Sequence, residues 1–512
     1  MVRTSILTLA LVFTWLTASA QPTRSCGTMQ GRSAWLKAYQ AQPLTFARGG
    51  DTTLYVALTI HIAGTEDGVG YFRREALYDA LCKLNADYAQ AGIRFFIAGE
   101  ILYHNNSSYY SHGSVLEGAE MMFAENVPNT LNIYFVNDPA GNCGYNLPYA
   151  GIAMKKGCSG PSDDTWAHEV GHALSLPHPF LGWEGGVSWD GSVAHDFSNP
   201  APERVTYDYT YFQDTLILDT MIIDTAYVER VDGSNCAFAA DGFCDTTPDY
   251  MAGRWTCNED GLSPTVQTDP NGETFRSDGS YIMGYANDPC QAIFTPGQIG
   301  AMRAFLLNER DEWLYDQTPA VYLSGPAQMT GPETATLHPA NQVTLSWTAV
   351  AGAEGYLVEV SRLSSFVGGL TDELVTTDTS LLVPDLDPNR TYYWRVRPYN
   401  RYDGCQGFEE VRNFQTDAAV NTAEPGQAVQ WRVFPNPVQA GLVHIQLNTG
   451  QTGPAELSLF DALGRPVLRQ IATLVNDQAD INLDVGHLPA GWYTLRWQAA
   501  GLSSTHKLII QP

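Results

Sequence analysis

The pattern of hydrophobic and polar residues changes near residue 319. Before that point, residues 53–62 alternate as in a strand, and residues 73–92 repeat leucines at helical spacing. The apolar runs 93–97 and 131–136 predict two further strands. Strands and helices in this order predict an α/β (α+β) domain.

Two more helices are expected, at about 163–175 and 298–314. Beyond residue 319 the chain consists of short β-runs broken by proline and glycine, without helical periodicity, and a small polar linker at 418–430 interrupts them. The sequence therefore predicts an α/β (α+β) domain followed by two all-β sandwich domains, at residues 51–316, 320–417 and 431–512.

The first twenty residues have the features of an export signal. Arg3 supplies the positive end, residues 6–15 form a short apolar run, and Ala18-Ser19-Ala20 is a small-residue cleavage site. The run is too short to span a bilayer and no later stretch is long enough, so we expect a cleaved signal at 1–20 rather than an uncleaved anchor. The polar residues 21–50 that follow are interpreted as a pro-segment.

Composition narrows the class of partner. The 512 residues include 28 Lys and Arg against 55 Asp and Glu, a formal charge of -27. Such a surface repels phosphate backbones and anionic lipid headgroups, which argues against nucleic-acid and membrane-surface binding. The mature chain is expected to have no transmembrane segment and to be secreted or attached to the cell surface after export through the periplasm.

The chain has nine cysteines, which in an exported protein argue for disulfides. Cys143 and Cys158 could close a short loop. Four others lie close together in sequence, at Cys236, Cys244, Cys257 and Cys290. Because nine is odd, at least one thiol has another role.

The candidate chemistry begins with two histidines four residues apart, His168 and His172. Four residues span slightly more than one helical turn, so both imidazoles lie on one face and can reach a single Zn²⁺ at roughly 2.0–2.1 Å. Glu169, beside them, is the expected general base, which takes a proton from the attacking water and gives it to the leaving amine.

A third histidine follows at His178. The helix cannot present it to the same metal without turning, and Pro177 favours such a turn because it disfavours helix at Leu176. The sequence predicts a three-histidine site, which resembles the extended zinc signature of the metzincins. That signature has glycine where this chain has Ser175, so a positive φ there would cost roughly 1 kcal/mol.

Downstream, Met283 and Tyr285 resemble the methionine turn of metzincins and the tyrosine that follows it. The resemblance implies that Met283 forms a hydrophobic floor under the histidines and that Tyr285 stabilises the tetrahedral intermediate. Taken alone, Met283 would more simply be a core residue.

Over roughly residues 24–310 the chain resembles the pappalysin family of metzincins, and its cytophagalysin-like bacterial branch most of all. The motifs that carry this resemblance are His168 to His178, Gly182-Trp183-Glu184, Cys244-Asp245-Thr246 with Pro248, Met283-Gly284-Tyr285, and Phe294-Thr295-Pro296-Gly297-Gln298. The family implies a two-lobed catalytic domain that holds zinc and, with ligands we do not assign, structural Ca²⁺. It also implies that an extended substrate lies along an edge strand, which we place at 149–154.

The resemblance also implies disulfides Cys236–Cys257 and Cys244–Cys290.

The segment 185–232 is longer than the family minimum, and in it Asp214, Asp219 and Asp224 alternate with apolar residues, as on a solvated strand face.

Cys26 stands in Arg24-Ser25-Cys26-Gly27-Thr28, which resembles the family's pro-segment motif. The resemblance implies that its thiolate caps the zinc and keeps the enzyme latent. The alternative is a disulfide from Cys26 to Cys82 or Cys405.

Some relatives prefer a basic side chain after the scissile bond, which needs an acid in the pocket that binds it. Here Gln291 stands in that place with Asp288 nearby, and we do not expect basic specificity.

Residues 320–417 resemble a fibronectin type III domain. Trp347 ends an early strand, and Tyr392 fits the corner at which a tyrosine hydroxyl bonds back to the backbone. Residues 431–512 resemble the C-terminal sorting domain of the type IX secretion system, through residues 433–437, 461–465 and 488–493. That resemblance implies a Gram-negative bacterium and the type IX machinery as a partner.

Together these features predict a secreted zinc endopeptidase that hydrolyses extracellular protein or peptide substrates. Two alternatives stay open. One is a non-catalytic surface adhesin that retains the protease fold, although an intact Glu169 argues against it. The other is a zinc amidase that acts on non-protein amides.

Overall fold

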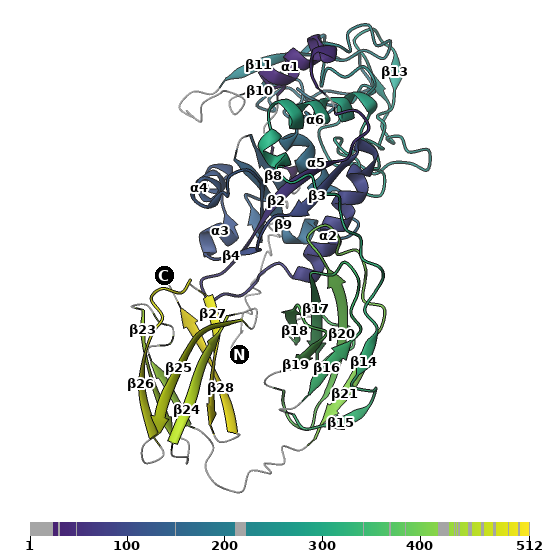
Figure 1. Ribbon diagram of the computed structural model, residues 1–512. Coiled ribbons are helices and arrows are strands. Elements are labelled where there is room, and N and C mark those ends of the chain that lie inside the picture. The colour runs from purple at the N-terminus through teal and green to yellow at the C-terminus, as the bar shows by residue number, and fades with distance from the viewer. Residues whose placement is uncertain are drawn as a thin grey trace, which may run out of the picture. The chain divides into compact units, whose positions relative to one another are not determined.

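The computed structural model describes residues 24–28, 31–47, 49–148, 150–209, 222–340, 343–367, 370–383, 386–417 and, with short gaps, 430–510. The expected signal at 1–20, Tyr149 and linker residues 418–429 lie outside the described residues. The chain separates into two compact units, Met1–Pro319 and Ala320–Pro512. The first unit is mixed α and β and the second is all β (Figure 1).

A seven-stranded sheet forms the centre of the first unit. Its order is β1-β8-β9-β6-β2-β3, with β4 also paired to β2. The bounds are β1 (Arg24–Cys26), β8 (Asn142–Leu147), β9 (Gly151–Lys155), β6 (Leu131–Val136), β2 (Leu54–Gly64), β3 (Ile93–Ile97) and β4 (Leu102–Asn105). The pairs among β2, β3, β4, β6 and β9 are parallel, and β8 runs antiparallel to β9. The strands expected at 53–62, 93–97 and 131–136 are confirmed.

The placement of the substrate edge at 149–154 is wrong. β9 lies inside the sheet, because it pairs with β6 on one side and β8 on the other. β8 is the next strand outward on that side, and β1 covers it in parallel register, with Cys26 opposite Gly144. β8 and β9 are two neighbouring antiparallel strands, and their sequence pattern does not say which of the two lies outside.

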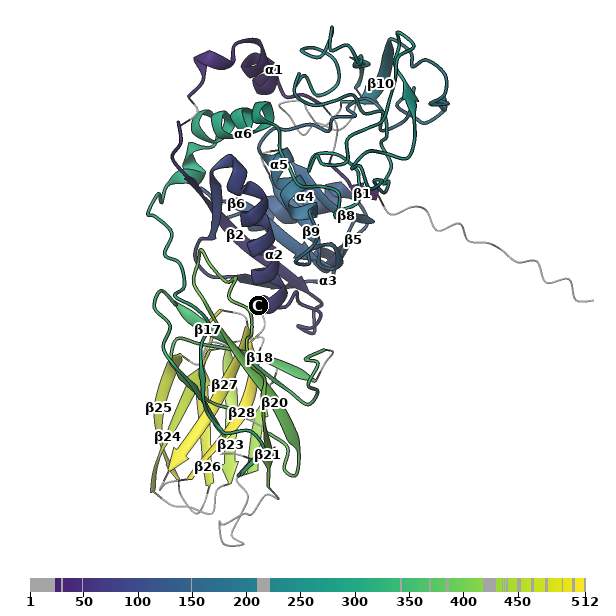
Figure 2. The ribbon, with the colours of Figure 1, turned by 90° about the vertical axis from the view of Figure 1, so that its right-hand side faces the viewer.

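Helices flank the sheet (Figure 2). The helix expected over 73–92 is α2 (Arg74–Asp87), continued by the 3-10 turn η2 (Tyr88–Ala91). The histidine helix is α5 (Thr165–Ala173), and it contacts β8. The last helix, α6 (Pro296–Asn308), begins two residues before the expected 298, because Thr295 and Gln298 form a capping box. The other short helices are α1 (Ala34–Ala41), η1 (Pro43–Thr45), α3 (Ser107–Tyr110), α4 (Val115–Glu125), η3 (Lys156–Cys158) and η5 (Asp311–Leu314).

The long segment at 185–232 contains an antiparallel pair, β10 (Arg204–Asp208) and β11 (Ile223–Tyr227). Asp224 lies on β11, where its carboxylate accepts a 3.1 Å hydrogen bond from the Tyr207 hydroxyl, while Asp214 and Asp219 are outside the described residues. Short pairs complete the unit: β5 (Ser111–His112) with β7 (Asp138–Pro139), and β12 (Gln267–Thr268) with β13 (Thr274–Phe275).

The disulfides are only partly those expected. Cys143–Cys158 is confirmed. Among the four clustered cysteines the bridges are Cys236–Cys244 and Cys257–Cys290, with Cα atoms 4.9 Å and 6.1 Å apart, so the expected pairs Cys236–Cys257 and Cys244–Cys290 are wrong. The turns between Asn235 and Gly242 fold the chain back within eight residues, and this brings Cys244 beside Cys236. Each bridge therefore closes its own segment.

The second unit contains two sandwiches. The first has sheets β14-β16-β19 and β15-β21-β20-β17-β18. The bounds are β14 (Met329–Gly331), β15 (Thr336–His338), β16 (Thr344–Trp347), β17 (Gly355–Ser361), β18 (Thr371–Thr376), β19 (Ser380–Leu382), β20 (Thr391–Tyr399) and β21 (Arg412–Thr416). Trp347 and Trp394 are buried in its core, and the Tyr392 hydroxyl accepts a 2.8 Å hydrogen bond from the backbone N–H of Asp387, as the tyrosine corner predicts.

The C-terminal sandwich has sheets β22-β23-β26 and β25-β24-β27-β28. The bounds are β22 (Gln430–Phe434), β23 (Leu442–Asn448), β24 (Gly453–Phe460), β25 (Pro466–Leu474), β26 (Gln478–Asp484), β27 (Gly491–Ala499) and β28 (Leu502–Ile510). Trp497 lies at the centre of its apolar core. Within the part of the chain that the structure describes, no helix has the length and apolar character needed to cross a membrane.

Candidate metal centre

Helix α5 presents His168 and His172 on one face, one turn apart. Each imidazole is fixed by a backbone carbonyl: Nδ1 of His168 donates to the oxygen of Ile282 and Nδ1 of His172 to that of Leu176, both at 2.7 Å. A proton on Nδ1 leaves Nε2 with its lone pair free for a metal. Burial lowers the pKa of His168 to about 4 and that of His172 well below its usual range, so both are held neutral, which is the ligand form.

The turn that follows α5 brings His178 back to the same point. Ser175 adopts φ 72°, the left-handed conformation for which the metzincin signature has glycine. The N–H of Ser175 bonds to the carbonyl of His172, and the N–H of Leu176 to that of Gly171, as in a Schellman motif. The Ser175 hydroxyl lies 2.8 Å from that of Ser33 in the N-terminal segment.

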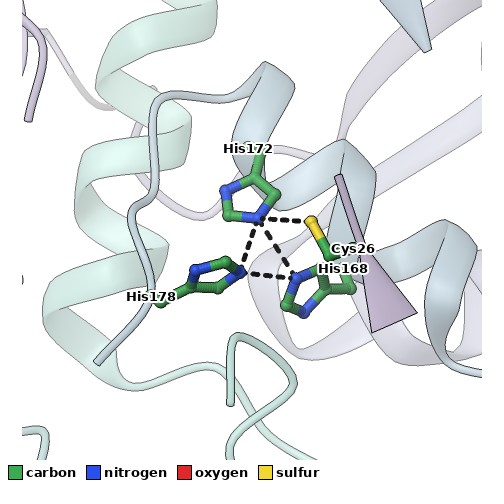
Figure 3. Close-up of side chains that lie close together, drawn as sticks. All are labelled: Cys26, His168, His172 and His178. Carbon is green, nitrogen blue, oxygen red and sulfur yellow. Dashed lines mark hydrogen bonds between the residues drawn. The ribbon is translucent and has the colours of Figure 1, made fainter. Parts of the chain in front are cut away.

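The three Nε2 atoms form a nearly equilateral triangle, at 3.0 Å (His168–His178), 3.1 Å (His172–His168) and 3.1 Å (His172–His178). The Cys26 sulfur lies 3.6 Å from Nε2 of His172, and all four side chains are buried and point toward one another (Figure 3). Tetrahedral zinc, with bonds of about 2.0–2.1 Å to nitrogen and about 2.3 Å to sulfur, separates two nitrogens by about 3.3 Å and nitrogen from sulfur by about 3.6 Å. The donor set fits a zinc ion.

Cys26 has a free thiol, so a disulfide to Cys82 or Cys405 is excluded. Its place opposite Gly144 follows from the pairing of β1 with β8, and the N–H of Thr28 lies 3.3 Å from its sulfur. Burial, and then the neighbouring Glu169 carboxylate, raise the pKa of the thiol well above its usual range. A cation is therefore what would stabilise the thiolate in this position.

Glu169 is fully buried beside the triangle. One carboxylate oxygen accepts a 2.7 Å hydrogen bond from the Thr28 hydroxyl, which itself accepts a 2.7 Å bond from the N–H of Asn146 on β8. Burial raises the pKa of Glu169 to about 7, against the hydrogen bonds from Thr28 and Cys26 that lower it. Gly144 is required here, because a Cβ on it would come within 2.9 Å of the Glu169 side chain.

Met283 lies under the histidine helix, as the methionine turn predicts. It is fully buried, and a side chain at Gly171, between the two helical histidines, would collide with its sulfur. The side chain of Gln291 stabilises the turn that contains Met283 by donating a 2.7 Å hydrogen bond to the carbonyl of Gly284. Gln291 is thus a buried structural residue.

Tyr285 closes one side of the site. Its ring centroid is 4.8 Å from that of His178 and 5.9 Å from that of His168. Its hydroxyl donates a 3.4 Å hydrogen bond to the carbonyl oxygen of Cys26. A carbonyl group next to the metal position is therefore already within reach of this hydroxyl.

A small cavity of about 10 Å³ adjoins the triangle and is lined by His168, Tyr285, Arg254 and Asp288 among others. Arg254 forms a 3.1 Å ion pair with Asp288. The acid noted in the sequence is therefore neutralised by a cation from the same chain, and the cavity has room for about one water molecule.

The N-terminal segment 24–47 contacts the rest of the unit at several points along its described residues. Arg32 donates to the carbonyl of Phe238 at 2.8 Å, and Gln40 donates to that of Asp241 at 2.8 Å. Trp35 packs edge-on to Phe305 of α6, with ring centroids 4.9 Å apart. These contacts hold Cys26 beside the three histidines and Thr28 beside Glu169.

Two buried carboxylates are candidates for the expected Ca²⁺ site. Glu229 and Asp241 are 3% and 0% exposed, and each has one buried oxygen with no hydrogen-bond partner among the described residues. Buried carboxylate oxygens without hydrogen-bond donors suit a hard cation. The calcium expectation stays a prediction.

Sequence reasoning missed two residues of the site, Thr28 and Glu184. Thr28 is far from Glu169 in sequence, and no local pattern links them. Glu184 has a carboxylate oxygen 3.7 Å from Nδ1 of His178. The only available signal was that both residues stand inside motifs quoted for the family resemblance.

Comparison with known proteins gives partial matches. Residues 432–511 match the family described as secretion system C-terminal sorting domain. An extracellular metalloprotease of Arthroderma gypseum is 26% identical over 202 residues, 35% of this chain and 68% of the relative. Extracellular metalloprotease 1 of Coccidioides posadasii is 27% identical over 221 residues, 38% of this chain and 78% of the relative. These similarities support an extracellular protease that carries a sorting tail.

Solved structures with local similarity are fibronectin type III domains. One is the fn3 domain of human collagen alpha-1(XX) chain, 24% identical, covering 22% of this chain and 99% of that one, with a TM-score of 0.15. Another is the FN1-FN3 region of chicken CNTN1, 14% identical, covering 37% of this chain and 67% of that one, with a TM-score of 0.15. At such TM-scores the likeness carries no argument about the rest of the chain.

Proposed function

We propose that this protein is a secreted zinc endopeptidase of the metzincin type, most similar to the pappalysins, and that it is made in a latent form. The observation that carries the proposal is the triangle of three Nε2 atoms, 3.0–3.1 Å apart, with Glu169 beside it. When bound, zinc supplies Lewis-acid chemistry: it polarises a substrate carbonyl and makes water a nucleophile at neutral pH.

Glu169 is the proton carrier in this proposal. Its carboxylate takes a proton from the attacking water and gives it to the leaving amine. A pKa near 7 suits both halves of that task. In the latent form the Thr28 hydroxyl occupies one of its oxygens, so the carboxylate becomes available only when Thr28 leaves.

Tyr285 and β8 handle the substrate. The Tyr285 hydroxyl, which now donates to the carbonyl of Cys26, would donate to the oxyanion of the substrate in the same place. The outer edge of β8 offers backbone hydrogen bonds to an extended peptide, and β1 now uses them. Substrate binding therefore requires that β1 leave β8.

Latency follows from two residues of one short segment. Cys26 occupies the position of the fourth metal ligand, and Thr28 holds the general base. The C-terminal sandwich directs the protein to the type IX secretion machinery, and the fibronectin-like sandwich is a spacer or adhesion module.

The test uses the purified full chain, activated by limited proteolysis, with casein as substrate. The proposal predicts cleavage that a zinc chelator abolishes and that added zinc restores, together with loss of at least 10³-fold in Glu169→Gln. Glu203→Gln, at an exposed acid outside the site, is the control and keeps activity. Full activity in Glu169→Gln would refute the proposed mechanism. Metal binding without cleavage of any protein would favour the adhesin, and mass spectrometry of products from a peptide library would reveal an amidase.

A further inference from the structure

We infer that Glu184 is the positioning residue for His178 and sets how tightly the third histidine holds the metal. This inference rests on the proposed zinc function. One carboxylate oxygen of Glu184, Oε1, is buried, lies 3.7 Å from Nδ1 of His178, and has no hydrogen-bond partner among the described residues. A buried carboxylate oxygen without a partner is costly, so a role at the adjacent imidazole accounts for it.

The other oxygen of Glu184 fixes the direction of the carboxylate. Oε2 accepts a 2.8 Å hydrogen bond from the backbone N–H of Gly182. The loop that carries both residues starts from His178 itself, since the N–H of Leu181 bonds to the carbonyl of His178. The carboxylate and the imidazole it faces are therefore parts of one short, hydrogen-bonded turn.

The long segment at 185–232 holds this turn in place. Gly182 has φ +101°, and a Cβ there would come within 2.8 Å of Val205 on β10 and 2.9 Å of Ala226 on β11. The strand pair thus packs directly on the backbone beside Glu184. Because β10 and β11 lie so close to the backbone of residue 182, only glycine fits there. We infer that the segment 185–232 supports the turn that carries His178.

Aromatic contacts fix the two ends of the turn. The ring of Phe180 stacks on that of His178 with centroids 4.5 Å apart and an interplanar angle of 20°. The ring of Trp183, which precedes Glu184, stacks on Tyr250 at 4.8 Å and 25°. A shift of His178 or of Trp183 would break one of these two ring stacks. The stacks therefore restrain the distance between the Glu184 carboxylate and the imidazole of His178.

The chemical consequence is that the three histidines are not equivalent. His168 and His172 donate from Nδ1 to neutral backbone carbonyls, whereas His178 faces a carboxylate. A carboxylate beside Nδ1 orients the ring and, when ionised, makes Nε2 more basic, and removing such an outer partner typically lowers metal affinity about 10–100-fold. Glu184 compensates for the position of His178 on a loop, outside the rigid helix.

The test compares the full-length protein with Glu184→Ala, Glu184→Gln and the control Glu203→Gln, which changes an exposed acid on the same segment. Zinc affinity is measured by competition with a chelator, and the melting temperature is measured on the metal-free proteins. We expect affinity to fall about 10–100-fold in Glu184→Ala and by less in Glu184→Gln, which keeps the shape of the side chain without the charge. Glu203→Gln should bind zinc within about twofold of wild type.

The metal-free melting temperature separates positioning from folding. We expect metal-free Glu184→Gln to have the same melting temperature as the metal-free wild type. The effect of the substitution should then appear only as a lower zinc affinity. Wild-type affinity in both Glu184 variants, or a loss matched by a lower metal-free melting temperature in both, would overturn the inference. A wild-type protein that binds no zinc would instead overturn the proposed function.

Discussion

The most informative perturbation of the latent form is Thr28→Val, which keeps the shape of the side chain and removes its hydroxyl. The hydroxyl makes two buried hydrogen bonds of 2.7 Å, one to the Glu169 carboxylate and one from the N–H of Asn146. A bond to a charged group contributes about 1.5–3 kcal/mol, and a buried N–H without a partner costs about 1–3 kcal/mol. A combined loss of about 3 kcal/mol raises the open fraction of the latch on the order of 100-fold.

The assay is the initial rate of cleavage of a fluorogenic peptide by the intact, unprocessed chain, with gel electrophoresis to show that the chain stays intact. We expect the leak activity of Thr28→Val to exceed that of wild type by on the order of 100-fold, because the restraint on Glu169 is then lost and the contact of Cys26 with the histidines is the one that remains at the site. Thr28→Ser keeps the hydroxyl and should leak within a few-fold of wild type. Equal leak in wild type and Thr28→Val would show that Thr28 does not restrain Glu169.

Three further predictions concern other parts of the catalytic unit. Gly171→Ala should lower both activity and the free energy of unfolding, by about 1–3 kcal/mol in denaturant titrations, because the new methyl group meets the Met283 sulfur; unchanged stability would contradict the packing described. Arg254→Ala should free the Asp288 carboxylate and raise the preference for a basic over a neutral side chain beside the scissile bond about tenfold in a peptide library, whereas an unchanged profile would place Asp288 outside substrate reach. Burial, and then the charge of Asp241, raise the pKa of Glu229 above its ordinary 4.5, so as pH rises Glu229 ionises in the unfolded chain before it ionises in the folded one. With calcium chelated, the free energy of unfolding should therefore fall as pH rises above about 4.5. Glu229→Gln should reduce that fall in thermal melts, and an equal fall in wild type and variant would contradict the prediction.

The parts of the site that follow from local geometry could be predicted from the sequence. A helix fixes the direction of His168 relative to His172, so their spacing alone predicts two ligands on one face. Pro177 indicated that the chain turns before His178, whereas the positive φ that Ser175 adopts was considered only as a possible cost. Free Cys26 at the triangle agrees with the pro-segment motif, although its role in latency stays a proposal.

The parts of the site that depend on contacts between residues distant in the sequence could not be predicted. Thr28 reaches Glu169 only because β1 pairs with β8, and no periodic pattern in three residues reports that pairing. The disulfide partners of Cys244 and Cys257 depend on turns between them that the spacing does not specify. The edge strand was misplaced for the same reason, since β8 and β9 differ in what lies beyond them rather than in their own composition.

The central claim, that three histidines hold zinc and Cys26 caps it until activation, is tested most directly by zinc-edge X-ray absorption on the intact and the activated protein. We predict about one zinc per chain, with three nitrogen neighbours at about 2.0–2.1 Å in both forms. A sulfur neighbour at about 2.3 Å should be present before activation and absent after removal of the pro-segment. A chain without zinc, or a metal shell that is the same before and after activation, would contradict the account.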